Sequence, residues 1–220
     1  MWYKLTWMYV WQDKVRPTAP TPILELSTDL TQCTSLADVT AEWWTGIAGY
    51  NSWSYTLANG NGLEIAWGSN YVLSLYYQLS TPLTTANKVV MRCTGYGYNG
   101  SYSGNLQMLL STASWDAWWT WSVLSFFSAG TGIVIDNTTS DLTHGDGYWD
   151  FDLTLTMDFS TWEITYTGTT SSGSASPINL TMTMDATQIQ NAISRSYLDF
   201  QLTCYSSYQH RIESAELTIY

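Results

Sequence analysis

Oxygen-bearing side chains are concentrated between residues 136 and 152, in the segment DNTTSDLTHGDGYWDFD. Asp136, Asp141 and Asp146 lie in the first part of this segment. Calcium takes about six to eight oxygen ligands, often from carboxylates and carbonyls of a flexible loop. These three aspartates are therefore candidate calcium ligands. Their spacing does not match an EF-hand, and a solvated loop is the alternative in a chain this acidic.

Thirteen tryptophans make the indole ring the most conspicuous side chain of the sequence. In the segment SWDAWWTWSV, Trp115 and two further tryptophans share one face of a strand, and Trp118 falls on the other. A flat aromatic ring with a polar rim can stack on a pyranose. We therefore take Trp118, Trp115 and Tyr102 as candidate glycan contacts. The alternative is that large rings fill a sandwich core or a subunit interface, which should take most of the tryptophans.

Three patterns associated with enzymes are incomplete in this chain. Gly95 to Gly100 matches the glycine pattern of dinucleotide sites, but no helix follows it, so we predict a hairpin loop there. The segment GSYSG has Tyr102 where a nucleophile elbow requires serine. No strand carries the Glu-x-Asp-x-x-Glu pattern of jelly-roll glycosidases, and Asp150 and Asp152 are expected on a solvated strand face. We predict that the protein is not an enzyme.

The net charge of −11 is unevenly distributed along the chain. Residues 1–17 contain three basic residues and one acidic residue, which leaves four basic and 17 acidic residues for the remainder. Proteins that bind nucleic acid present basic patches to the phosphates. The body of this protein is therefore not expected to bind nucleic acid. The opening segment has nowhere near the roughly 20 apolar residues that a membrane-spanning helix needs.

The first 22 residues have a pattern of their own. Aromatic residues alternate as on a strand, and a tract with three prolines follows, which excludes a helix. We predict an N-terminal strand arm and spacer over residues 1–22, which contacts another chain, and a domain over residues 23–220. The predicted contact residues of the arm are Trp2, Tyr3, Trp7, Trp11 and Arg16. The alternative is that this segment is the first strand of the domain's own sheet.

The rest of the chain predicts an all-β domain. Short alternating segments are separated by turn residues at intervals typical of a sandwich or jelly roll. The exception is residues 185–193, which predict a short helix with Asp185 as N-cap and Gln188 completing a capping box. The three cysteines exclude a full set of paired disulfides, and Cys93 and Cys204 are in phase with core positions.

The order of these elements from Leu63 to Tyr220 resembles a concanavalin A-like or laminin-G-like jelly roll. The segment YWDFDLTLTMDFSTWEITYTG, the short helix and the closing strand RIESAELTIY carry the resemblance. It implies a two-sheet antiparallel jelly-roll sandwich, a module whose lectin-like members often hold calcium. The opening YVWQDKVRPT is similar to arms that precede such modules in phage particle proteins.

Two functions are consistent with these observations. The first is a non-enzymatic structural subunit of a phage or virus particle, such as a fibre, tail or capsid-decorating protein. It would lie on the virion surface and contact copies of itself and neighbouring particle proteins through the arm. The second is a carbohydrate-binding module or receptor-binding protein that recognises surface glycans, in a particle or outside the cell. A glycan-active enzyme with unrecognised acids is a third, weaker alternative.

Overall fold

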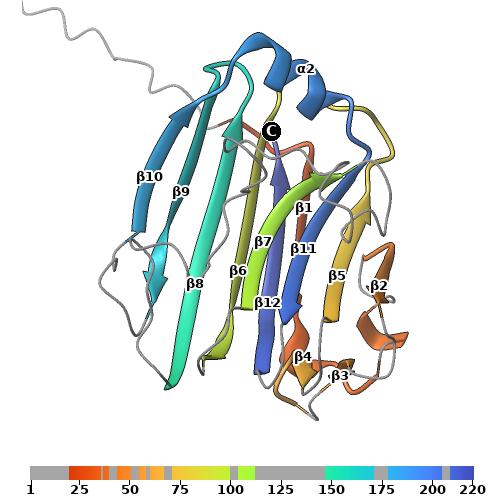
Figure 1. Cartoon of the computed structure of the whole chain (residues 1–220). Coiled ribbons are helices and arrows are strands. Elements are labelled where there is room, and N and C mark those ends of the chain that lie inside the picture. The colour runs from red at the N-terminus through yellow and green to blue at the C-terminus, as the bar shows by residue number, and fades with distance from the viewer. Residues whose placement is uncertain are drawn as a thin grey trace, which may run out of the picture.

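The computed structural model describes residues 20–35, 37–39, 44–50, 55–57, 60–66, 71–99, 104–111, 147–170, 178–204 and 209–220. Within these ranges the protein is built from two antiparallel β-sheets, an α-helix over Ala186–Ile193, helical residues 37–39 and a 3₁₀ turn over Leu30–Gln32. The predicted all-β sandwich is thereby confirmed (Figure 1). The predicted arm, including Trp2, Tyr3, Trp7, Trp11 and Arg16, lies outside the described residues.

In the described ranges the larger sheet contains eight strands. Their order is β10 (Ile178–Thr183), β9 (Glu163–Thr170), β8 (Gly147–Asp158), β6 (Lys88–Asn99), β12 (Gln209–Ile219), β4 (Leu63–Ala66) and β3 (Tyr55–Leu57), with β1 (Leu24–Asp29) also paired to β12. Strand β6 occupies one edge of β12. Strands β4 and β1 therefore share the other edge, β4 along residues 209–212 and β1 along residues 214–219.

The smaller sheet has four strands among the described residues and lies in front of the larger one in Figure 1. Their order is β2 (Gly46–Tyr50), β5 (Tyr71–Gln78), β11 (Tyr197–Cys204) and β7 (Gly104–Ser111). The chain crosses between the sheets several times, although β3 and β4, and likewise β8, β9 and β10, follow one another within the larger sheet. Helix α2 (Ala186–Ile193) carries the chain from β10 of the larger sheet to β11 of the smaller one. The helix closes one end of the sandwich (Figure 1).

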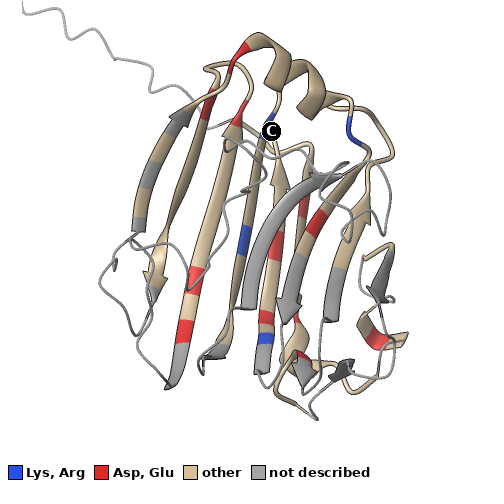
Figure 2. Cartoon of the chain, in the orientation of Figure 1, with Lys and Arg blue, Asp and Glu red and all other residues tan. Residues whose placement is uncertain are grey.

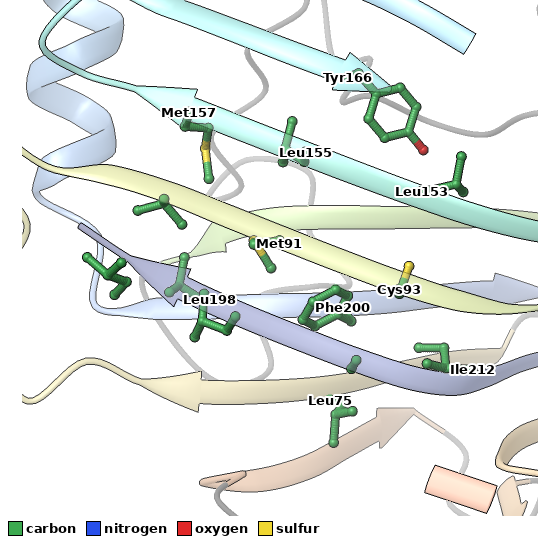
Figure 3. Close-up of a cluster of buried hydrophobic side chains, with 14 of the residues drawn as sticks. Leu75, Met91, Cys93, Leu153, Leu155, Met157, Tyr166, Leu198, Phe200 and Ile212 are labelled. Carbon is green, nitrogen blue, oxygen red and sulfur yellow. The ribbon is translucent and has the colours of Figure 1, made fainter. Parts of the chain in front are cut away.

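The hydrophobic core fills the space between the two sheets (Figure 3). This core forms because the two-residue period of the strands places alternate side chains on the inner face of each sheet. The inner residues of β6, β8 and β11 are buried: Val89, Met91, Cys93, Phe151, Leu153, Leu155, Met157, Leu198 and Phe200. The predicted core position of Cys93 is confirmed, and burial raises the pKa of its thiol. The side chain of Cys204 lies outside the described part.

Helix α2 is built as its sequence predicts. Asp185 is the N-cap, and its carboxylate accepts a hydrogen bond from the backbone N–H of Gln188 (2.8 Å). The side-chain oxygen of Gln188 in turn accepts from the backbone N–H of Asp185 (2.8 Å). This capping box satisfies backbone donors that a helix N-terminus otherwise leaves unpaired. Ile189 and Ala192 are buried and hold the helix against the core.

The predicted loop at Gly95 to Gly100 is wrong over most of its length, because strand β6 continues to Asn99. These residues pair with β8 on one side and, as far as Gly97, with β12 on the other. Gly95 lies opposite Phe151 and Ile212, just where the register of β12 shifts. Its lack of a side chain lets the neighbouring strand approach closely. Glycines in this segment therefore serve strand packing.

The outer face of the larger sheet carries a charged network centred on Arg92 (Figure 2). Its guanidinium donates two hydrogen bonds to the carboxylate of Asp152 (2.9 and 2.8 Å) and a third to Glu216 (3.0 Å). All three side chains are partly exposed. Asp150 is exposed on the same face, so the predicted solvated position of Asp150 and Asp152 is confirmed. The hydrogen bonds from Arg92 lower the pKa of Asp152.

Replacing Arg92 with leucine is expected to lower the free energy of unfolding at pH 7 by up to about 1 kcal/mol, the upper range for exposed ion pairs. The pKa of Asp152 is lower in the folded than in the unfolded chain. Its contribution is therefore present at neutral pH and is lost as the pH falls through the folded pKa. Urea unfolding should show the difference between wild type and R92L shrinking below about pH 4. A difference that stays constant down to pH 2 would contradict this assignment.

Candidate functional site

The outer face of the smaller sheet carries two tyrosines and a carboxylate close together. Tyr76 follows the buried Leu75 on β5, and Tyr197 and Asp199 flank the buried Leu198 on β11. Because side chains alternate along a strand, these three residues lie on the face that points away from the core. We call Tyr76, Tyr197 and Asp199 the tyrosine cluster.

Register brings the members of the cluster together. Tyr76 lies directly opposite Asp199, and Tyr197 lies one pair further along, opposite Gln78. The rings of Tyr76 and Tyr197 meet edge to face, with centroids 5.8 Å apart and an interplanar angle of 73°. Both tyrosines are partly exposed, whereas only 1% of Asp199 is exposed. The two rings are therefore the parts of the cluster that solvent and a ligand can reach.

Backbone hydrogen bonds fix the two strands that carry the cluster. The N–H of Thr45 donates to the carbonyl oxygen of Tyr76 (3.0 Å), and its hydroxyl accepts from the N–H of Gln78 (2.7 Å). The N–H of Leu79 donates to the carbonyl oxygen of Ser196 (2.8 Å). The cluster is therefore held on a rigid frame at the end of the sandwich that α2 closes (Figure 1).

This arrangement is suited to binding uncharged polar molecules. Tyrosine rings offer apolar faces together with hydroxyls that can donate and accept hydrogen bonds. In the described ranges there is no group of three or more histidine, cysteine or acidic side chains that could hold a metal ion. None of the helices in those ranges is long and apolar enough to cross a membrane.

The site residues that the sequence predicted fall on other parts of the chain. Trp115, Trp118 and Tyr102, and the candidate calcium ligands Asp136, Asp141 and Asp146, lie outside the described residues and stay predictions. The sequence analysis missed the tyrosine cluster. Period-two alternation with Leu75 and Leu198 could have placed Tyr76 and Tyr197 on outer faces. It could not have shown that they meet, since that depends on the pairing of β5 with β11.

No protein-family model and no curated protein matches this chain. Several solved structures have a similar fold. Peanut lectin with a nine-residue peptide has a TM-score of 0.59 at 12% identity, covering 90% of this chain and 97% of the lectin. Lectin UEA-II complexed with galactose has a TM-score of 0.54 at 10% identity, covering 90% and 99%. The chain has the concanavalin A-like sandwich fold. A lectin from Bauhinia forficata in complex with GalNAc gives 0.54 at 9% identity, again covering 90% and 99%.

The concanavalin A-like fold agrees with the resemblance that the sequence suggested. At about one-tenth identity the likeness is one of architecture, shared over nearly the full length of each lectin. Fold alone does not determine function, because the same architecture hosts unrelated sites. The comparisons bear on the sandwich and not on the predicted role in a phage or virus particle.

Proposed function

We propose that this protein is a non-enzymatic carbohydrate-binding protein and that the tyrosine cluster contacts the glycan. The observation that carries the proposal is the meeting of Tyr76, Tyr197 and the buried Asp199 on one outer sheet face. The structural neighbours support it, since two of them are lectins described as complexed with galactose and with GalNAc.

The chemistry of the cluster favours a neutral sugar. The apolar face of a pyranose can pack against a tyrosine ring, while its hydroxyls can exchange hydrogen bonds with tyrosine hydroxyls. The chain carries a net charge of −11 and the cluster contains a carboxylate. Anionic polysaccharides would therefore be repelled, and electrostatics favour uncharged glycans.

Replacing both Tyr76 and Tyr197 with alanine is expected to weaken binding to a neutral glycan by about tenfold or more, equivalent to about 1.4 kcal/mol. Retention on galactose-agarose and GalNAc-agarose, followed by calorimetric titration with the retained sugar, measures this change. The matched control is Tyr96→Ala, which removes a tyrosine from the outer face of the larger sheet, under the guanidinium of Arg211. This control should bind as the wild type does.

Two results would contradict the proposal. The first is a wild-type protein that binds no neutral glycan on an array at high protein concentration. The second is release of new reducing ends from a bound polysaccharide, which would show that the protein is an enzyme acting on glycans. Equal binding by the double variant and the wild type would show that the tyrosine cluster is not the glycan site. The proposal that the protein binds carbohydrate would still stand.

A further inference from the structure

The hairpin between β8 and β9 presents an exposed tryptophan in an unusual backbone conformation. Asp158 ends β8, Glu163 begins β9, and Phe159 to Trp162 form the loop between them. Trp162 has φ of 65°, and 46% of its surface is exposed. In the described part of the chain the other residues with positive φ are glycines, namely Gly60, Gly62 and Gly168. Trp162 thus occupies a position where glycine or asparagine is the favoured residue.

Hydrogen bonds hold this loop in place. One carboxylate oxygen of Asp158 accepts from the backbone N–H groups of Ser160 (3.1 Å) and Thr161 (3.2 Å), and from the hydroxyl of Ser160 (2.6 Å). The carbonyl oxygen of Trp162 accepts from the N–H of Met184 (2.7 Å), and the side chain of Phe159 is buried. The left-handed conformation of Trp162 is therefore imposed by its surroundings, as is common for strained residues at functional sites.

The surroundings of the exposed ring are polar and acidic. Ser160, Thr161 and Glu163 are exposed. Asp185, the N-cap of α2, directly follows Met184, whose N–H binds the carbonyl of Trp162. In Figure 2 the ribbon is coloured for acidic residues near the top of the β8–β9 hairpin and just before α2. The residues on either side of Trp162 in the chain therefore carry hydroxyls and a carboxylate that are exposed as its ring is.

We infer that Trp162 is a second glycan contact, which stacks on an uncharged sugar ring of the same ligand that the tyrosine cluster binds. The inference rests on the proposed function. A protein partner is less suited to this surface, because protein interfaces have a core of several apolar residues. Among the described residues the other exposed large apolar side chain is Ile23, which precedes β1. A single ring with polar neighbours matches the size and chemistry of one pyranose.

The position of Trp162 indicates what length of glycan this protein takes. Helix α2 begins beside the Trp162 hairpin and ends shortly before Tyr197. Both contacts therefore lie at the end of the sandwich that α2 closes (Figure 1). Eight helical residues span about 12 Å, so the contacts are separated by roughly a helix length. One monosaccharide cannot cover that distance, whereas a short oligosaccharide can. The ligand class is therefore a neutral oligosaccharide or polysaccharide.

Three variants separate the contribution of the Trp162 ring to binding from the effect of its backbone conformation. Trp162→Ala removes the ring and keeps the strain, Trp162→Gly removes the ring and the strain, and Trp162→Tyr keeps an aromatic ring. With a neutral galactan as the probe, the Ala and Gly variants should bind about tenfold more weakly, and the Tyr variant within about threefold of the wild type. With galactose alone all three should match the wild type, because one sugar reaches only the tyrosine cluster.

Melting temperatures show whether a variant that binds more weakly has also lost its fold. The Gly variant should melt higher than the Ala variant by a few degrees, the reverse of the usual ranking of these residues.

Equal galactan binding by the wild type and the Gly variant would overturn the inference and leave the proposed function standing. A wild type that binds neither galactose nor galactan, nor any other neutral glycan on the array, would overturn both. Binding of a protein partner that the Gly variant loses, with galactan binding unchanged, would also overturn it.

Discussion

Replacing Phe200 with alanine is expected to lower the free energy of unfolding by about 3–5 kcal/mol. The side chain of Phe200 is fully buried on the inner face of β11. Its ring meets the ring of Trp44 edge-on, with centroids 5.6 Å apart and an interplanar angle of 86°. Truncation removes the whole ring from the centre of the core and leaves a cavity that two hydrogen-bonded sheets cannot close.

The loss from Phe200→Ala is large compared with the total stability of a domain, which is about 5–15 kcal/mol. Urea unfolding followed by circular dichroism should show a lower midpoint with little change in slope. Ile23→Ala is the matched control, since it also truncates a large apolar side chain, but one that is 72% exposed. It should change stability by less than about 0.5 kcal/mol. Similar losses for the two variants would contradict the position of Phe200 in the core.

Replacing Gly95 with alanine is expected to destabilise the protein by about 1–3 kcal/mol or more, because a side chain has no room there. A Cβ atom at this position would collide with the carbonyl oxygen of Arg211 and would lie 2.6 Å from Cζ of Phe151. The carbonyl belongs to the backbone of β12, which pairs with β6 along most of its length. Relief of the collision therefore requires a shift between two central strands of the larger sheet.

The variant Gly60→Ala tests the energetic cost of a left-handed backbone conformation where no steric collision is expected. Gly60 has φ of 83°, but the nearest atom to an added Cβ would be the carbonyl oxygen of Thr31 at 3.8 Å. Alanine should cost about 1 kcal/mol there, from the left-handed conformation alone. Thermal unfolding should therefore rank Gly95→Ala as the more destabilising variant. The opposite ranking would mean that β6 and β12 lie further apart than the register implies.

Local sequence patterns determined the elements of this protein and their inner faces. The alternation Phe151, Leu153, Leu155 and Met157 predicted a long strand with one buried face, and all four side chains are buried. Asp185 and Gln188 predicted the start of α2, and both hydrogen bonds of the capping box are present. These features depend on residues that are neighbours along the chain, so their physics can be read without knowing the fold.

The boundary of β6 shows where local patterns fail. The glycine pattern from Gly95 to Gly100 is followed by no helix and predicts a hairpin loop. The strand continues through Gly95 and Gly97 because β8 and β12 supply hydrogen-bond partners on either side. Close approach of β12 favours a residue without a side chain at Gly95. The pairing that overrides the local preference comes from residues far along the chain.

The candidate site was decided by tertiary structure alone. Tyr76 and Tyr197 meet because β5 pairs with β11 in a particular register, and a shift of one residue would turn each tyrosine toward the core. The left-handed backbone and the exposure of Trp162 depend on the contact of its carbonyl with Met184 after β10. The sequence alone specifies which side chains alternate along each strand. Which of them meet across strands is fixed only when hydrogen bonds between distant segments set the register.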